Sequence, residues 1–452
     1  MKTLWQHSNK PYGSDWFFNF TAAEDRLYDE FLIPYDVFSN IAQVMGLHKI
    51  SLLNGNEKDE LLDKLREIYQ LWDNNEFHLN ETDEDVHSAI EKYLTSKCGD
   101  TGKKIHAGRS RNDLILSDIR LYTKVQLRDI FSQWLQITDI LKDKTANNHG
   151  IFFPGYTHTQ PAMPNSADAW FMGYLELFML SFDAVIESYY AVDSSPLGSA
   201  AGFGVPHIKI DKSFIADTLG FSKPLYAVTS AQLFRGLAEQ KIISALNIAA
   251  QVYNRMASDI ISYVGMDKQF VQVSDDQVSG SSIMPQKRNP DVWELIRGES
   301  HVYAGWLTQL YSLTNNMSSG YHRDLQLVKK ILMDALNHMK RLNDAVIHAL
   351  KGVSFNKDAC EKALSRELFA THIANKLTLE GMPFREAYQR AGSIYPEMDV
   401  PDNETLSNSY HHEGAPGKCD AQFFDNELQE YATWLDNHNS EWSEILNKLL
   451  SN

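Results

Sequence analysis

Apolar residues at helical spacing constrain the fold of this chain most. They recur every three, four or seven residues at Val328, Ile331, Leu332, Ala335, Leu336, Met339, Leu342 and Val346. This period is typical of an amphipathic helix with one buried face. A second helix is indicated by Phe131, Trp134, Leu135 and Leu141, and the segment 231–264, with one glycine and no proline, predicts a third. Few alternating strand patterns compete, so we predict an all-α fold around a central bundle of long helices.

The chain has 452 residues, which exceeds what one hydrophobic core usually serves, and 43% of them are hydrophobic. Glycine, proline and serine gather at four breaks, 98–108, 152–164, 194–206 and 274–290. After Phe355 the predicted helices become shorter. We therefore predict three units: an N-terminal helical domain (1–108), a central helical bundle domain (109–357) and a small C-terminal helical domain (358–452).

Charge and cysteine content exclude several classes of protein. The net charge of −17 argues against a nucleic-acid partner, and it means that an anionic substrate must meet a local cationic pocket. Three widely separated cysteines, Cys98, Cys360 and Cys419, predict free thiols and suit a reducing cytoplasm. Residues 1–7 are polar from the start and lack the apolar run of a secretory signal. We expect a cytoplasmic protein.

The most apolar run, 169–186, could be mistaken for a membrane span. It carries Glu176 and Asp183, and it reaches only the lower limit of spanning length. We predict a buried bundle helix instead, and no membrane partner.

Twelve residues, 279–290, concentrate reactive side chains directly before a predicted helix. A mobile glycine, two hydroxyls, two cations and a helix-starting proline follow one another: Gly280, Ser281, Ser282, Lys287, Arg288 and Pro290. A loop that caps a helix is the simpler interpretation, and two serines followed by a proline would alone favour it. The order of all twelve residues favours chemistry.

The signature loop of the aspartase/fumarase superfamily, whose members eliminate fumarate from a succinyl-bearing substrate, resembles residues 280–290, Gly-Ser-Ser-Ile-Met-Pro-Gln-Lys-Arg-Asn-Pro. The resemblance implies that Ser281 is the catalytic base, on a loop that closes over the substrate. Lys287 would lower the pKa of that serine and stabilise the carbanion. Ser282, Gln286 and Asn289 would bind substrate.

A second cluster, Arg109-Ser110-Arg111-Asn112, precedes a helical run that starts near Leu114. Free backbone amides and the helix dipole favour anions at such a position, so a carboxylate site is one interpretation. A surface helix cap made by the serine or the asparagine is the other, and the residues alone leave the two about even. Arg-Ser-Arg-Asn-Asp resembles the form found in argininosuccinate lyases, as does Gln286 in the loop. That resemblance implies that all four residues bind substrate.

His158 lies in a third cluster, 155–161, bounded by glycine and proline. A lone histidine is more often structural than catalytic, but imidazole titrates near working pH and could trade protons or hold a carboxylate. The resemblance pairs His158 with Glu294 and assigns Thr157 to a succinyl carboxylate. The two paired residues lie far apart in the sequence, so only the resemblance connects them.

A fourth cluster opens the apolar-striped helix and is by itself an ordinary polar helix start. In the family that it resembles, the residues matching Tyr321, Gln326 and Lys329 contact the arginine-derived end of the substrate. Thr21, in a segment similar to the family's Phe-Asn-Ala-Ser, would bind there too. The segment 84–87 resembles a stretch that lines the site, although an exposed acidic helix start explains it about as well.

Three positions depart from the family pattern. Thr159 and Pro161 stand where leucine and arginine are commoner, and Gln232 takes the place of an arginine, with Arg235 nearby. The adjacent His411 and His412 lack further ligands, and the glycines of 198–204 lack the context of a dinucleotide fingerprint. We expect no metal and no cofactor.

The resemblance covers nearly the whole chain. It implies three helical domains, a homotetramer with each active site built from three subunits, and cleavage of a small-molecule substrate, argininosuccinate, to arginine and fumarate, the last step of arginine biosynthesis. Two alternatives stay open. One is a sister carbon-nitrogen lyase for another N-succinyl amine; the other is a catalytically silent homologue, which the intact loop disfavours.

Overall fold

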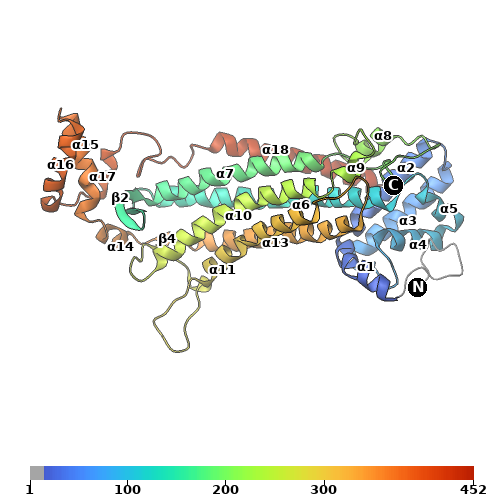
Figure 1. Ribbon diagram of the computed structural model, residues 1–452, viewed down its shortest axis with the longest axis horizontal. Helices are drawn as coiled ribbons and strands as arrows, with labels where there is room; N and C mark the ends of the chain where they lie inside the picture. Colours follow the sequence, from blue (N-terminus) through green and yellow to red (C-terminus); the bar gives the residue numbers. More distant parts are fainter. Residues whose placement is uncertain (1–14, 452) are drawn as a thin grey trace.

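Long parallel and antiparallel helices give the molecule an elongated shape (Figure 1). The computed structural model describes residues 15–451, so the polar start at 1–7 lies outside the described residues. The bundle consists of α6 (Arg111–Asn147), α7 (Ala167–Val192), α10 (Leu237–Val264), α11 (Asp291–Ser300), α12 (Val302–Leu313) and α13 (Gln326–Lys351). The predicted all-α class is confirmed.

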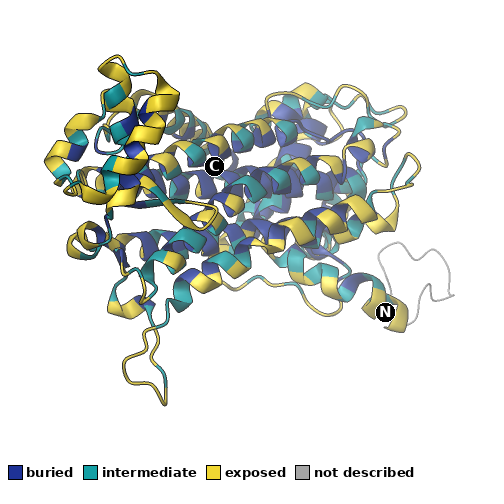
Figure 2. Cartoon of the chain, turned by 60° about the vertical axis from the view of Figure 1, so that its left-hand side comes forward, coloured by how far each residue is buried: buried dark blue, intermediate teal, exposed yellow. Residues whose placement is uncertain are grey.

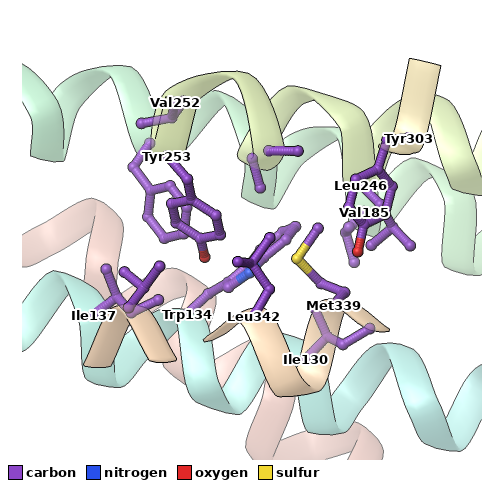
Figure 3. Close-up of a cluster of buried hydrophobic side chains, with 14 of the residues drawn as sticks. Ile130, Trp134, Ile137, Val185, Leu246, Val252, Tyr253, Tyr303, Met339 and Leu342 are labelled. Carbon is purple, nitrogen blue, oxygen red and sulfur yellow. The ribbon is translucent and has the colours of Figure 1, made fainter. Parts of the chain in front are cut away.

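The apolar stripe predicted from Val328 to Val346 forms the inner face of α13. All eight of its apolar residues are buried. Figure 3 shows part of the core that they join, where aromatic and aliphatic side chains from several helices interlock. Trp134 and Tyr253 both donate hydrogen bonds to Asn343 Oδ1, at 3.1 and 2.7 Å. The one buried amide therefore satisfies two polar groups while their rings contribute apolar area.

The segment 231–264 is not one helix, as the sequence predicted, but two. The short α9 (Ser230–Leu233) ends before Gly236, and α10 begins after it. Gly236 has a φ of 86°, which a residue without Cβ adopts at little cost. Its backbone N–H donates to Glu239 Oε2 at 2.6 Å, so a side chain within α10 caps the new helix.

The apolar run 169–186 lies within α7, which packs against α6 and α10. Within residues 15–451, α7 is the one helix that is long and apolar enough to cross a membrane. Phe171, Leu175, Phe178 and Phe182 are fully buried on it. This packing fits the predicted bundle helix, since core helices of soluble proteins have the same length and composition.

An N-terminal helical unit covers one end of the bundle. It contains α1 (Asp15–Asp29), α2 (Ile33–Lys49), α3 (Gly55–Asp73), α4 (Val86–Cys98) and α5 (Asp100–Lys103), with α8 (Lys212–Thr218) against α2. Asn54 and Asp85 form capping boxes at the starts of α3 and α4. These caps satisfy backbone donors at the helix starts and fix where α4 enters the unit.

The opposite end of the bundle carries α14 (Lys357–Lys362), α15 (Ala370–Leu379), α16 (Phe384–Ile394) and α17 (Asn403–Ser409). The last helix, α18 (Asp425–Leu450), returns along the bundle, with Leu435 in the bundle core and Leu449 in the N-terminal core. Burial accordingly follows the length of the bundle, while the end unit is largely exposed (Figure 2). The predicted division at 358 stays a prediction, and α18 joins regions on both sides of it.

Two small strand pairs complete the described part of the chain. The hairpin of β1 (Phe152–Thr157) and β2 (Gln160–Ser166) follows the end of α6. β3 (Val271–Gln272) pairs with β4 (Ser354–Phe355), which follows the end of α13. The three cysteines are free thiols, as predicted.

Candidate active site

A polar cavity of about 190 Å³ lies where the starts of α6 and α13 meet α1 and α4. We call it the basal pocket. Its lining is Asp25, Asp29, Asp85, His87, Arg111, Asn112, Ile115, Arg235, Tyr321, Arg323, Gln326 and Lys329. Five residues from two separate sequence predictions meet here: Arg111, Asn112, Tyr321, Gln326 and Lys329.

Lys329 is the buried cation on the floor of the basal pocket. It lies between Asp25, 2.7 Å from its Oδ1, and Asp29, which it also bonds. These two acids occupy successive turns of α1, so both carboxylates reach the same face. Burial alone would lower the pKa of Lys329, but Asp29 and Asp25 outweigh it and raise that pKa. The lysine therefore stays charged.

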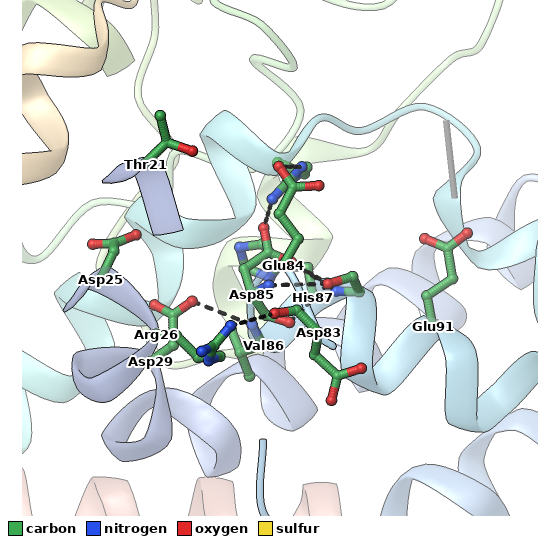
Figure 4. A network of polar contacts seen from close by, with 12 residues as sticks. Thr21, Asp25, Arg26, Asp29, Asp83, Glu84, Asp85, Val86, His87 and Glu91 are labelled. Atoms are coloured by element: carbon green, nitrogen blue, oxygen red, sulfur yellow. Dashed lines mark hydrogen bonds and ion pairs between the residues drawn. The ribbon is translucent and has the colours of Figure 1, made fainter. Parts of the chain in front are cut away.

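Neighbouring polar contacts fix the wall formed by α1. Gln326 donates from Nε2 to the backbone oxygen of Thr21 at 2.7 Å, so the two predicted residues are adjacent. Arg26 donates to the backbone oxygen of Asp83 at 3.0 Å (Figure 4). The Val86 N–H donates to Asp29 Oδ2 at 3.2 Å. α1 is thereby tied to the start of α4.

The cluster 109–112 acts both as a helix cap and as a pocket wall. Ser110 caps α6, since its Oγ accepts from the Asn112 N–H at 3.3 Å. Arg111 pairs with Glu84 at 3.0 Å and with Asp85. The two interpretations of this cluster are therefore compatible.

Arg109 takes a different place from its neighbours. It is buried, and its Nη1 donates to Asn40 Oδ1 at 2.6 Å. The guanidinium thus lies inside the N-terminal unit and does not line the basal pocket. Its predicted contact with substrate stays a prediction that this position does not support.

Asp113 connects the start of α6 with the segment 198–200. Its Oδ1 accepts from the Ser110 N–H at 2.9 Å, and its Oδ2 accepts from the N–H groups of Gly198 and Ala200 at 3.1 and 2.7 Å. Burial raises the pKa of this carboxyl to about 6, although the three backbone donors act in the opposite direction.

A buried histidine-carboxylate cluster lies behind the pocket, and sequence reasoning missed two of its members. His87 bonds Asp36 through Nδ1 and lies 3.8 Å from Asp118 Oδ2. Ser39 donates to Asp118 Oδ1 at 2.7 Å. Burial and the neighbouring Asp36 raise the pKa of Asp118 well above its usual range. These three groups are close enough to hold a metal; His87 and Asp36 bond each other, whereas Asp118 Oδ2 has no hydrogen-bond partner within the described residues. An aspartate inside the apolar start of α2 was the available signal.

The loop 279–290 projects away from the bundle, toward the end opposite the basal pocket (Figures 1 and 2). Ser279 and Asn289 close its neck through paired backbone hydrogen bonds of 3.2 and 2.9 Å. Ser281 Oγ accepts from the N–H groups of Ile283 and Met284, at 3.3 and 3.2 Å. Ile283 is 82% exposed. The helix predicted behind the loop is α11, which carries an exposed Glu294.

His158 and Thr159 form the tip of the β1–β2 hairpin, and both have positive φ angles, 52° and 63°. Such a two-residue connection matches the twist of the strands, but it strains residues that have a Cβ, and branched ones most. The His158 side chain is exposed, and it makes no hydrogen bond to Glu294 within the described chain. The structure therefore displays His158 without joining it to its predicted partner.

The two groups of predicted residues lie far apart in one chain. The 37 residues of α6 span about 55 Å, and the basal pocket lies at its start while the hairpin follows its end. Likewise, Tyr321, Gln326 and Lys329 lie at the start of α13, and the loop emerges beside β4 after its end. One chain therefore does not bring Ser281 or His158 to the basal pocket.

Known proteins resemble the chain in sequence and in fold. A family model described as lyase matches residues 24–305. The chain is 36% identical over 399 residues to argininosuccinate lyase of Parabacteroides distasonis, covering 88% of this chain and 89% of that protein. Identity to argininosuccinate lyase of Sorangium cellulosum is 35% over 419 residues, with coverage of 93% and 95%.

Solved structures share the fold at low sequence identity. An EDDS lyase variant with bound fumarate has a TM-score of 0.78 at 18% identity, covering 98% of this chain and 95% of its own. A class II fumarase from Schistosoma mansoni has a TM-score of 0.68 at 15% identity, covering 94% and 90%. The structures show the fold, and the sequence relatives and the family model show that the chain belongs to the argininosuccinate lyase family.

Proposed function

We propose that this protein is a carbon-nitrogen lyase that cleaves argininosuccinate to arginine and fumarate. The observation that carries the proposal is the basal pocket, where Arg111, Asn112, Tyr321, Gln326 and Lys329 converge from α6 and α13 in a chain that also keeps the loop with Ser281 and Lys287. Relatives that carry the name argininosuccinate lyase, at 35–36% identity, support the choice of substrate.

The reaction removes a weakly acidic proton next to a carboxylate. Ser281 Oγ takes this proton, and the electron pair is held as an aci-carboxylate dianion until it forms the double bond of fumarate. The carbon-nitrogen bond then breaks, and the nitrogen leaves with a proton as part of the arginine guanidinium. Lys287 and loop amides stabilise the dianion, because fixed positive charge acts most strongly where negative charge develops.

Residues from both ends of the helical bundle bind the substrate. Ser110, Asn112, Thr157, Ser282, Gln286 and Asn289 hold the succinyl part, and Thr21, Arg111, Tyr321, Gln326 and Lys329 hold the arginine-derived part. Arg109, which the resemblance assigns to substrate, donates to Asn40 inside the N-terminal unit, so we give it no part in either group. His158, oriented by Glu294, serves as acid or carboxylate clamp.

This division requires more than one chain, so we propose a homotetramer with active sites shared between subunits. The separation along α6 supports it, and so do exposed apolar side chains on α10, α11 and α12, Leu237, Leu295 and Tyr311. Apolar surface of this kind on bundle helices is typical of subunit contacts. The proposal includes a cytoplasmic location and a role in arginine biosynthesis.

Fumarate formation tests the proposal directly. Purified protein is mixed with argininosuccinate, adenylosuccinate or aspartate, and the ultraviolet absorbance of fumarate is followed. We expect a rise with argininosuccinate, and a loss of about 100- to 10,000-fold in the Ser281→Ala variant, the usual contribution of a positioned base. Since the hydrogen bonds of the Ser281 hydroxyl within residues 15–451 stay inside its own loop, the variant should keep the wild-type melting temperature.

Turnover of another N-succinyl amine, without turnover of argininosuccinate, would replace the substrate assignment. Gln232, which stands where the family has an arginine, is the observation that keeps this sister lyase in view. Unchanged activity in Ser281→Ala would instead remove the base from the mechanism and leave the substrate standing.

A further inference from the structure

Two cations that line the basal pocket, the exposed Arg323 and the buried Arg235, have no carboxylate partner within residues 15–451, and only Arg235 is held out of solvent. Lys329 is neutralised by Asp25 and Asp29, and Arg111 by Glu84 and Asp85. Arg235 is only 7% exposed, yet its Nη1 has no hydrogen-bond partner within residues 15–451. Its Nη2 makes one long bond, 3.4 Å, to the backbone oxygen of Leu325.

The surroundings hold this guanidinium in place. Its Cζ lies 5.1 Å from the centre of the Tyr321 ring, a stacking distance that orients the planar group. Arg235 lies between the end of α9 at Leu233 and Gly236, whose positive φ turns the chain into α10. A buried charge costs several kcal/mol unless it is paired, so a fixed, unpaired arginine that lines a cavity indicates an anionic ligand.

Gln232, on the same segment, also bears on the role of Arg235. It stands where the family has an arginine, and its buried amide has partners on neither its nitrogen nor its oxygen within the described chain. It lies one helical turn before Arg235, on the segment that α9 begins. A cation missing at the first position is therefore present at the second, and this one lines the pocket.

We infer that Arg235 binds the α-carboxylate at the arginine-derived end of the substrate, in place of the arginine that Gln232 replaces. The inference rests on the proposed function, which assigns the succinyl carboxylates to the loop, the hairpin and Asn112. Tyr321 is assigned to the arginine-derived end of the substrate, and Arg235 stacks on the Tyr321 ring. Two parallel N–H donors suit a carboxylate, and the acids of the pocket have their own cations.

Binding of arginine and of agmatine, which is arginine without the carboxylate, isolates this contact. Both are titrated into the full-length protein by calorimetry. Wild type should bind arginine more tightly than agmatine. Arg235→Gln should weaken arginine binding roughly 10- to 100-fold, the loss expected for hydrogen bonds to a charged group, and leave agmatine binding within about twofold.

Two further variants make the result specific. Lys330→Gln removes the same charge from the residue after Lys329, which lies outside the pocket lining, and should leave the ratio of the two affinities unchanged. Arg235→Lys keeps the charge and loses the paired donors, so it should give an intermediate ratio. If the glutamine variant does not fold, the lysine variant carries the comparison.

Equal weakening of arginine and agmatine binding by Arg235→Gln would overturn the inference, as would a wild type without preference for arginine. Fumarate formation from argininosuccinate by the wild type distinguishes failure of the role of Arg235 from failure of the proposed function. Turnover with an unchanged affinity ratio rejects only the role of Arg235. Absence of turnover rejects the proposed function itself.

Discussion

The basal pocket and the loop 279–290 carry the predicted chemistry at opposite ends of the molecule, and they differ in how much their own chain fixes them. In the pocket, Lys329 and Arg111 are paired with carboxylates, and these contacts connect α13 with α1 and α6 with the start of α4. In the loop, one backbone pair closes the neck, and most side chains beyond it are exposed. The pocket is formed in a single chain, whereas the loop is offered outward.

This difference follows from what each region must do. Binding a charged amino acid favours groups held in position beforehand, because less ordering free energy is lost when the ligand arrives. A base on a loop that closes over the substrate needs the freedom to move, so it makes few contacts while the site is open. Substitutions in the pocket should therefore change stability as well as binding and activity, and substitutions in the loop should change turnover alone.

Mixing two inactive subunits should give the largest effect. Asn112→Ala damages the pocket end and Ser281→Ala the loop end, so each alone should be nearly inactive. If a site combines the pocket of one chain with the loop of another, mixed assemblies contain some intact sites. We expect fumarate formation at least about tenfold above either parent, well within the 100- to 10,000-fold that one catalytic group contributes.

The mixture is prepared by co-expression with two affinity tags, and each parent is handled identically. Activity no greater than the average of the parents would mean that one chain supplies both ends, against the length of α6. Mixing Ser281→Ala with Lys287→Ala is the matched control, because both changes lie on one loop and no site regains an intact loop.

Lys329→Ala should destabilise the protein by about 3–5 kcal/mol, because it leaves the buried carboxylate of Asp29 and the partly buried one of Asp25 without their cation. Lys330→Ala, one residue further along α13, removes a half-exposed lysine and should cost about 1 kcal/mol or less. Urea unfolding followed by circular dichroism measures both. Similar small losses of stability in the two variants would show that Asp25 and Asp29 do not need the charge of Lys329.

The titration of Asp113, at the pocket end, should be detectable in the pH dependence of the unfolding free energy. Its folded pKa, about 6, exceeds the ordinary value, so its contribution is present at low pH and is lost as pH rises through about 6. The difference corresponds to about 3 kcal/mol. Asp113→Asn should lower stability at every pH, since the amide nitrogen opposes backbone donors, and it should remove this part of the slope between pH 4 and 7.

Unfolding free energies at several pH values, for wild type and variant, give that slope as a difference, which cancels the other titrating groups. Parallel curves for the two proteins would contradict the raised pKa. Ser281→Ala, at the loop end, should run parallel to wild type and serves as the reference.

The two regions also differ in how far the sequence could predict them. Residues of the loop are consecutive, so their order alone identified them, and the α13 stripe predicted its buried face. The ion pairs of Lys329 with Asp25 and Asp29 join positions about 300 residues apart, and no spacing rule reaches across that distance. The break at Gly236 was missed because one glycine within a long apolar segment is often tolerated in a helix. A side chain three residues away, Glu239, caps the new start.

The hairpin tip gives the smallest effect and the sharpest test of strain at the loop end. Thr159 has a φ of 63°, which its branched Cβ disfavours, so Thr159→Gly should stabilise the protein by about 0.5–1 kcal/mol. Thr157→Gly, in β1 two residues earlier, should destabilise it by a similar amount, because glycine there only adds freedom to the unfolded chain. Opposite signs in urea unfolding would show that the tip is held in a costly conformation that displays His158. The same sign for both would mean that the hairpin carries no such strain, and that His158 is presented by ordinary strand geometry.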